Sequence, residues 1–226
     1  MFQLLFSNPA LFAAWIAAVL VSLTFHEFSH ALVARLRGDR TAEREGRLSL
    51  NPLDHVDPMG LLAFLFLGFG WAKPVPYNPY NLKDPKWDSV AIAFAGPVSN
   101  LLFAAVAAAL FRVLVGGGVI APLNLLAGFL FLTVYLNLAL AVFNLIPVHP
   151  LDGAKLAFAL LDGPRHAAAR EFIAVRGPQI LMFLIVLSFL TPFHPFGFVS
   201  DAATGLCSSF LGGSCDAYFG ALFAGV

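Results

Sequence analysis

Two histidines with a glutamate between them are the residues of this sequence best suited to chemistry. His26 and His30 are four positions apart, so on a helix both imidazoles lie on one face, within reach of a single metal ion. Glu27 lies three positions before His30, beside that face, where a carboxylate can activate a metal-bound water without being a ligand itself. The spacing therefore predicts a zinc site of the hydrolytic type.

Two plainer interpretations of these residues are open. They could satisfy one another inside a helix bundle, or the helix could end at Leu23 and leave them among lipid headgroups. An ionised carboxylate in an apolar helix costs roughly 2.5 to 3.5 kcal/mol on insertion scales. An uncompensated Glu27 beside two imidazoles is therefore unfavourable. A metal ion with its bound water would offset that cost, which favours the metal site.

A catalytic zinc needs a third protein ligand, since such sites usually carry three and keep one position for water. Asp152 is the best candidate, because two prolines interrupt residues 144–151 before it and broken helices within membranes line cavities. An ordinary turn in which Asp152 pairs with Lys155 is the competing interpretation. His149 is a rival ligand, although a supporting or structural role fits it better.

The remaining histidines and the cysteines are weaker candidates. His55, His166 and His194 lie in or beside charged or peripheral segments, and each is expected to be a solvated surface residue. Cys207 and Cys215 have no histidine closer in sequence than His194, so a serine or cysteine protease is disfavoured. The two cysteines are compatible with a disulfide or with a pair of buried thiols.

The composition places these residues in a membrane. Of the 226 residues, 59% are hydrophobic and 12% are charged, against about 25% charged in an average soluble domain. The formal net charge is zero, which argues against nucleic acid as a partner. Residues 9–34 form an apolar run that is too long for a secretory signal and contains the histidine pair. We therefore expect a single membrane-embedded domain over residues 1–226.

The apolar runs predict an all-α polytopic membrane protein with about five to six transmembrane helices. Residues 89–111, 113–148 and 177–193 contain no charged residue or histidine and are read as spans together with the first run. Glycines and a proline within residues 116–122 open the long middle run. Its helix is therefore placed at about residues 123–143.

Two further apolar segments fit the pattern of spans less well. Residues 59–72 are short and end in a glycine-containing stretch, which suits a re-entrant or hairpin element between the first and second long spans. Residues 194–226 form an apolar tail rich in Gly and Ser. This tail is suited to an extra span or to an interfacial helix.

The basic residues predict the orientation, because Lys and Arg gather in cytoplasmic loops. If residues 59–72 re-enter, twelve of the thirteen basic residues fall on one side and Arg112 on the other. That side is then the cytoplasm, and the amino terminus is extracytoplasmic. His26, His30 and Asp152 all lie near the cytoplasmic ends of their segments in this arrangement, so the separate parts of the site can meet.

Three asparagines, Asn100, Asn137 and Asn144, lie near or within the spans. A polar side chain in that setting needs a partner or a cavity, so at least one of them is expected to face a substrate. The segment Gly-Pro-Val-Ser-Asn at residues 96–100 has a plainer interpretation as a kinked helix whose small residues allow close packing.

Four motifs follow one another along the chain: His-Glu-Phe-Ser-His at 26–30, Gly-Trp-Ala-Lys-Pro-Val-Pro-Tyr-Asn-Pro at 70–79, Ala-Gly-Pro-Val-Ser-Asn at 95–100, and the segment 144–153 that ends in Asp-Gly. Together they resemble the site-2 protease family of intramembrane zinc metalloproteases. The resemblance is to a minimal member without a PDZ or CBS domain. The chain departs from the family at His149 and in its tail.

The resemblance implies that His26, His30 and Asp152 hold one Zn²⁺ per chain, that Glu27 is the general base, and that Asn144 helps to hold the substrate backbone. A substrate helix must unwind before hydrolysis, and an extended strand can replace the lost hydrogen bonds by pairing with an exposed edge. Residues 73–79 are expected to guide such a strand. The candidate substrate-binding residues are Asn144, Asn100, Lys73, Pro74, Val75 and Pro76.

The expected function is hydrolysis of peptide bonds within or near transmembrane segments of membrane-anchored regulatory proteins. The expected partners are these transmembrane substrates and the lipid bilayer, in the cell membrane. A metal-binding membrane transporter could use the same ligands, but transport does not require Glu27 in the base position. A non-catalytic scaffold for transmembrane helices is a third hypothesis, and the intact set of ligands and base argues against it.

Overall fold

The computed structural model describes residues 2–67 and 69–224, without the side chains of residues 2, 3 and 67, and its regular structure is helical. Within these ranges the β pairing consists of one isolated antiparallel bridge, between Val56 and Ala72. The α-helices are α1 (Phe2–Ser7), α2 (Pro9–Leu36), α3 (Thr41–Arg44), α4 (Pro58–Leu67), α5 (Pro85–Phe111), α6 (Leu125–Asn144), α7 (Gly153–Leu160), α8 (Ala167–Leu190), α9 (Gly197–Leu211) and α10 (Cys215–Leu222). Shorter helical turns are η1 (Pro52–Asp54), η2 (Pro79–Asn81), η3 (Arg112–Gly116) and η4 (Pro164–His166).

Polar side chains cap the starts of the three long helices that carry the site. The side-chain oxygens of Asn8, Asp84 and Asn124 accept backbone N–H bonds at the starts of α2, α5 and α6. These bonds satisfy donors that have no partner within the helix. Pro9 and Pro85 follow two of the caps, where a missing N–H costs nothing. The local sequence thus determines where these helices begin.

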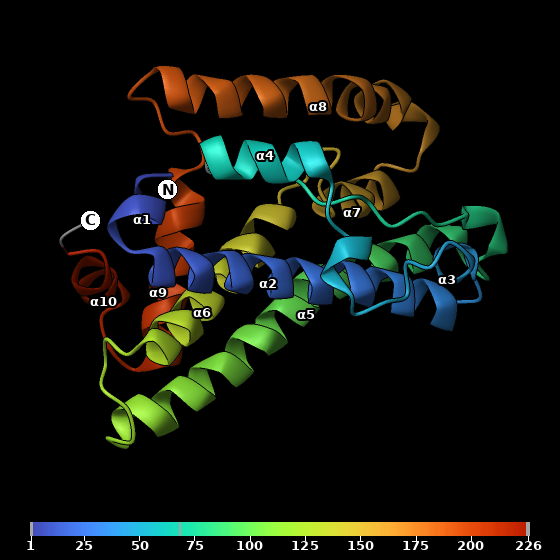
Figure 1. Ribbon diagram of the computed structural model, residues 1–226. Coiled ribbons are helices and arrows are strands. Elements are labelled where there is room, and N and C mark those ends of the chain that lie inside the picture. The colour runs from blue at the N-terminus through green and yellow to red at the C-terminus, as the bar shows by residue number, and fades with distance from the viewer. Residues whose placement is uncertain (1, 68, 225–226) are drawn as a thin grey trace.

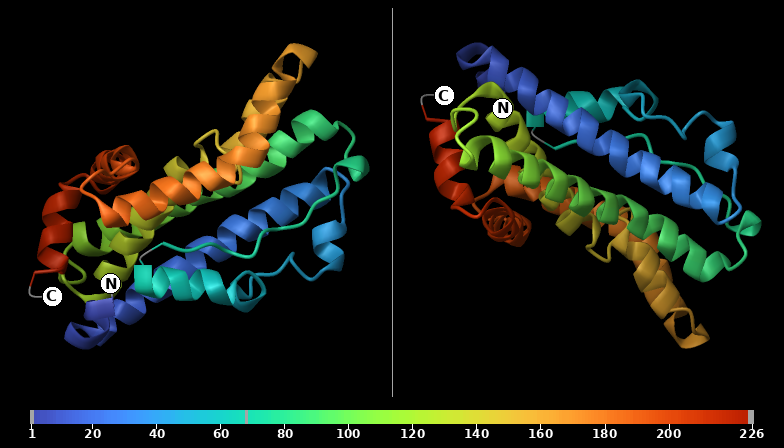
Figure 2. Two further views of the ribbon diagram at one scale, coloured as in Figure 1. Left: turned by 90° about the horizontal axis from the view of Figure 1, so that it is seen from above. Right: turned by 90° about the horizontal axis from the view of Figure 1, so that it is seen from below.

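Helices α2, α5 and α6 pack against one another and form the centre of the fold (Figures 1 and 2). Their shared core contains many alanines, including Ala18, Ala104, Ala108 and Ala127. Small side chains let helix backbones approach closely, which is the common way to join helices in lipid, where burial from water gives little driving force. The approach of α2 to α5 is what later brings the histidines against α5.

Four helices among the described residues are long and apolar enough to cross a membrane, and the protein is a multi-pass membrane protein. They cover Pro9–Leu36, Pro85–Gly116, Leu125–Asn144 and Pro164–Leu190. The helix expected at residues 123–143 is confirmed to within two residues. Helices α9 and α10 have 15 and 8 residues, fewer than the roughly 20 that a span needs. The five to six spans expected from the sequence therefore exceed the four found among the described residues.

Residues 58–67 and 69–76 form the two arms of a hairpin, α4 and a returning extended segment. The two arms touch closely, since a Cβ on Gly60 would lie 2.0 Å from the carbonyl oxygen of Trp71. Phe64 of α4 stacks on Trp15 of α2 with ring centroids 4.4 Å apart. At 1.5 Å per residue, Trp15 lies about 31 Å from Leu36, the last residue of α2. The chain then runs back past α2 to the start of α5 (Figure 2). This shape suits the expected re-entrant or hairpin element.

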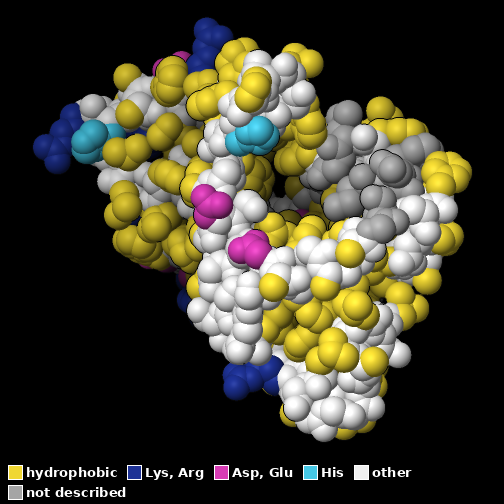
Figure 3. All heavy atoms as spheres, turned by 90° about the vertical axis from the view of Figure 1, so that its left-hand side faces the viewer, with side chains coloured by type: hydrophobic (Ala, Val, Ile, Leu, Met, Phe, Trp, Pro, Cys, Tyr) yellow, Lys and Arg dark blue, Asp and Glu magenta, His cyan; other side chains and the backbone are white. Residues whose placement is uncertain are grey.

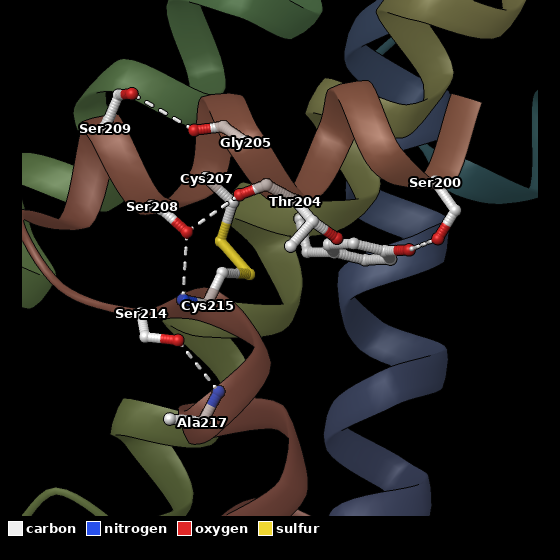
Figure 4. Close-up of a disulfide and its surroundings, with 10 residues drawn as sticks. Ser200, Thr204, Gly205, Cys207, Ser208, Ser209, Ser214, Cys215 and Ala217 are labelled. Atoms are coloured by element: carbon white, nitrogen blue, oxygen red, sulfur yellow. Dashed lines mark hydrogen bonds between the residues drawn. A yellow bond between two sulfur atoms is a disulfide. The ribbon is translucent and has the colours of Figure 1, made fainter. Parts of the chain in front are cut away.

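A disulfide between Cys207 and Cys215 ties α9 to α10 (Figure 4). Both cysteines are buried in the core that α2, α5 and α6 share. Ser208 Oγ accepts a hydrogen bond from the Cys215 backbone N–H. This bond and the disulfide together hold the turn between the two helices. The rings of α10 pack onto α5 and α6, where Tyr218 contacts Phe111 and Phe131. The sequence was compatible with a disulfide or with a pair of buried thiols, and the structure has the disulfide.

Candidate metal centre

His26, His30 and Asp152 form a compact cluster of potential metal ligands. The Nε2 atoms of the two histidines are 3.0 Å apart. Asp152 Oδ2 lies 3.3 Å from His26 Nε2 and 3.4 Å from His30 Nε2. The histidines are buried and Asp152 is partly buried. The structure therefore brings together the three residues that the sequence singled out from segments more than 120 positions apart.

These separations match the donor set of a tetrahedral zinc ion. Zinc bonds of about 2.0–2.1 Å at tetrahedral angles place neighbouring donor atoms about 3.3 Å apart. Asp152 Oδ2 is buried and makes no hydrogen bond of acceptable geometry, although it lies within 3.4 Å of both nitrogens. A cation between the three atoms would satisfy all of them, whereas a single hydrogen cannot. Two imidazoles and one carboxylate fit zinc.

A turn that folds back on the end of α6 carries Asp152 to the histidines. Gly153 makes this turn possible, because a Cβ there would lie 2.3 Å from the carbonyl oxygen of Leu145 and 2.6 Å from that of Ile146. Burial raises the pKa of the Asp152 carboxyl, but the adjacent imidazoles of His26 and His30 outweigh it and lower this pKa to about 2. The carboxylate is therefore charged at neutral pH, as a metal ligand must be.

Helix α5 lies directly behind the two histidines. His30 Nδ1 lies 2.7 Å from the carbonyl oxygen of Ile92, and His26 Nδ1 lies 3.2 Å from Asn100 Nδ2. Between these contacts, a Cβ on Gly96 would lie 2.4 Å from His26 Cε1 and 2.5 Å from His30 Nε2. Glycine is therefore required at this position for the rings to approach α5.

A cavity of about 930 Å³ adjoins the cluster and is lined by Glu27 as well as by all three cluster residues. Its size is at the upper end of the range for small-ligand sites, about 300–1,000 Å³. The face of the molecule seen in Figure 3 is largely hydrophobic and is hollowed near its middle. Apolar side chains of the cavity wall come from α2, α4, α6 and α8 and include Leu23, Phe64, Leu140, Phe143 and Leu181.

The extended segment at residues 72–76 forms part of the cavity wall and is held by hydrogen bonds with His55 and Arg47. Lys73 N–H donates to the His55 carbonyl at 2.8 Å. The Arg47 guanidinium donates to the Lys73 carbonyl at 2.5 Å and to the Pro74 carbonyl at 3.2 Å. Arg47 is only 4% exposed, so its guanidinium bonds to these carbonyls and has little contact with solvent. Pro74 and Val75 face the cavity from this fixed backbone.

The proposed substrate-binding residues do not all reach the cavity. Asn144, Pro74 and Val75 line it, whereas Lys73 is exposed and neither it nor Pro76 is part of the wall. Asn100 is completely buried against His26. Its position favours an interaction with the histidine over a contact with substrate.

The other histidines differ from one another in their surroundings. His149 lines the cavity outside the ligand cluster. Burial and the Lys155 ammonium lower its pKa, which leaves the imidazole neutral at pH 7. The expectation that His55 is a solvated surface residue is wrong. It is 1% exposed and its Nε2 lies 2.7 Å from the Ser49 carbonyl oxygen, because the hairpin folds over the loop that contains it.

Sequence reasoning missed two supporting groups, the carbonyl of Ile92 and the guanidinium of Arg47. A backbone carbonyl has no signature in the sequence. Arg47 is one of several arginines in its loop, and only its burial distinguishes it from them. The sequence therefore contains no signal that could have identified either group as part of the site.

Comparisons with known proteins show what this chain is similar to. The chain is 40% identical over 148 residues to YwhC of Bacillus subtilis, across 62% of this chain and 66% of that protein. It is 33% identical over 152 residues to Rip2 of Mycolicibacterium smegmatis, across 65% of this chain and 57% of that protein. Rip2 of Mycobacterium tuberculosis is 32% identical over 189 residues, across 80% of this chain and 68% of that protein.

All three relatives are named as candidate zinc metalloproteases, and the chain spans less than two thirds of the length of the first two. No solved structure matches the chain closely enough to support a comparison. The model of peptidase family M50 matches residues 14–124 and 115–188, which include all of the metal cluster. The chain therefore belongs to peptidase family M50.

Proposed function

We propose that this protein is a zinc-dependent intramembrane endopeptidase that cleaves peptide bonds within or near transmembrane segments of membrane-anchored regulatory proteins. One observation carries the proposal: three donor atoms 3.0–3.4 Å apart face a cavity that Glu27 also lines, within a bundle of membrane-spanning helices. Family membership and the names of the relatives support it.

The proposed roles follow from donor chemistry and position. His26, His30 and Asp152 hold one zinc ion, which when bound polarises a peptide carbonyl and makes a water molecule more acidic. Glu27 takes the proton of the attacking water and delivers it to the leaving amine. Glu27 is 8% exposed and follows His26 directly in α2, so the ligand and the proton carrier share one rigid support.

The substrate is proposed to bind as an extended strand along residues 72–76. This segment is fixed by hydrogen bonds with Arg47 and His55, so its backbone needs no further ordering when a substrate strand lies along it. Asn144 at the end of α6 lines the same cavity, and we propose that its side chain hydrogen-bonds the backbone of the unwound substrate.

We propose that a substrate helix reaches the cavity between α4 and α8. Helix α8 contributes only Gly177, Leu181 and Ile185 as buried residues, whereas α6 contributes ten. A helix with so little buried surface separates from its neighbours at low cost. Leu181 of α8 and Phe64 of α4 both line the cavity, so separation of these helices opens it towards lipid.

The proposed orientation has the amino terminus outside the cytoplasm and the metal site near the cytoplasmic side. The basic ends of α2, α5 and α8 lie at the same end of the molecule (Figure 1), as expected for cytoplasmic ends. His30 is six residues from Leu36, which corresponds to a depth of about 9 Å below the end of α2.

The test uses the detergent-purified protein and a tethered substrate with a single transmembrane helix. Zinc content and cleavage are measured for the parent and for Glu27→Gln. The parent is expected to contain one zinc per chain and to cleave, while Glu27→Gln keeps zinc and loses cleavage, because the amide cannot accept the proton. Equal cleavage by both proteins would refute the role of Glu27. Zinc binding without cleavage by the parent would point to transport.

A further inference from the structure

One face of α5 meets both zinc-binding histidines. Ile92, Gly96 and Asn100 are spaced four residues apart, so they lie in one row along the helix. Ile92 contacts His30 through its carbonyl, Gly96 leaves space for both rings, and Asn100 contacts His26. These three residues share no side-chain chemistry, and what joins them is their contact with the two ligands.

The contact of His30 shows which of its nitrogens is free. A carbonyl oxygen only accepts hydrogen bonds, so His30 Nδ1 donates to the carbonyl of Ile92 at 2.7 Å. A neutral imidazole then carries its hydrogen on Nδ1 and has a lone pair on Nε2. Nε2 is the atom that lies beside Asp152 Oδ2. The backbone of α5 therefore presents His30 in the form that binds a metal.

His26 has a different partner that can act either as a donor or as an acceptor. Asn100 Nδ2 lies 3.2 Å from His26 Nδ1, and Asn100 Oδ1 is buried without a hydrogen-bond partner. A metal bound through His26 Nε2 requires the ring hydrogen on Nδ1, and two donors cannot face each other. A half-turn of the amide replaces Nδ2 with Oδ1 at nearly the same place. Oδ1 then accepts from His26 Nδ1–H.

We propose that Asn100 is a positioning residue of the metal centre, whose side-chain oxygen accepts a hydrogen bond from His26 Nδ1–H and so orients His26 Nε2 towards the metal. The inference rests on the proposed zinc site. It assigns to α5 the support of both histidines, by a backbone carbonyl for His30 and by an amide for His26. Outer hydrogen-bond partners of this kind fix ring orientation and strengthen metal binding.

Asn137 is a matched control within the same core. It is completely buried, like Asn100, and its Oδ1 also lacks a partner. Its Nδ2 donates to Ser22 Oγ at 2.7 Å, so it joins α6 to α2 one turn before His26. Replacement of Asn137 removes a buried amide of α6 that contacts α2 through Ser22, and it leaves the contacts of the histidines with α5 intact.

The experiment measures the zinc dissociation constant by chelator competition for the parent, Asn100→Leu, Asn100→Asp and Asn137→Leu in detergent. Asn100→Leu is expected to weaken zinc binding about 10- to 100-fold. Asn100→Asp keeps an acceptor and is expected to bind zinc about as tightly as the parent. Asn137→Leu is expected to lower the melting temperature and leave the zinc dissociation constant unchanged. Absorption spectra of the cobalt-substituted proteins should change for Asn100→Leu only.

Two results would overturn the inference. One is an unchanged zinc dissociation constant in Asn100→Leu, and the other is equal weakening in Asn100→Asp and Asn100→Leu, which would show that the oxygen is not the acting atom. If Asn100→Leu does not fold, Asn100→Ala carries the same expectation. A parent protein that binds no zinc would refute the proposed function itself, and this result is distinct from the two above.

Discussion

Replacement of Gly96 by alanine tests whether α5 supports the histidines. The added Cβ would lie 2.4 Å from His26 Cε1 and 2.5 Å from His30 Nε2, whereas carbon atoms in contact are about 3.5–4.0 Å apart. Either the rings or α5 must therefore retreat by about 1 Å. Metal–ligand distances tolerate only about 0.2 Å, so the displaced rings cannot both reach a zinc ion without strain.

The magnitude follows from the cost of overpacking. Forcing an extra carbon into a packed site costs about 1–3 kcal/mol, and if zinc must restore the ring positions, its affinity falls by this amount, about 5- to 150-fold. The matched control is Gly205→Ala in α9, where a Cβ meets nothing within 4 Å. That change should stabilise the helix by about 0.5–1 kcal/mol.

Zinc content by elemental analysis, zinc affinity by chelator competition and the melting temperature in detergent decide between these outcomes. We expect Gly96→Ala to lose zinc affinity and Gly205→Ala to keep it. If Gly96→Ala binds zinc as tightly as the parent and melts at the same temperature, the close packing of α5 against the histidines does not determine the metal site.

Three further predictions follow from the surroundings of the site. Arg47→Lys should raise the KM for a tethered substrate while kcat and zinc content stay unchanged, because an ammonium cannot hold two carbonyls as a guanidinium does; the exposed Arg44→Lys should change neither. Burial raises the pKa of Asp39, but hydrogen bonds from Asn81, Thr41 and Asn78 outweigh it and lower this pKa. The stabilisation of the fold by the Asp39 carboxylate is therefore present above pH 3.8 and lost as the pH falls further. The melting temperatures of the parent and Asp39→Asn should converge in acid. Asp152→Ala should lose zinc and His149→Ala should keep it, and the reverse result in metal analysis would make His149 the ligand.

Much of the fold could be predicted because its signals are local. A backbone in lipid must satisfy its own hydrogen bonds, so long apolar runs become helices wherever they occur. The run at residues 9–34 is α2 (Pro9–Leu36), and capping by Asn124 starts α6 two residues after the position expected. The spacing of His26 and His30 likewise follows from the pitch of a single helix.

The number of spans and the shape of the tail were less predictable. Residues 194–226 have the composition of a span, but the chain breaks into two short helices at Gly212, whose φ is +73°. Cys207 and Cys215 then meet across this turn. An apolar composition shows that a segment avoids water, but it does not show whether the segment crosses the bilayer or packs on its neighbours.

The sequence by itself determined the types of the proposed ligands, the helix that carries two of them and the break in the chain that carries the third. Tertiary structure alone decided which polar residues contact these side chains. Asn100 and Asn144 have the same side chain and similar apolar surroundings in sequence, yet the first is buried against His26 and the second lines the cavity. The difference arises because Asn100 lies within α5 on the face that contacts α2, whereas Asn144 lies at the end of α6 beside the cavity, and these positions are set by packing between distant segments.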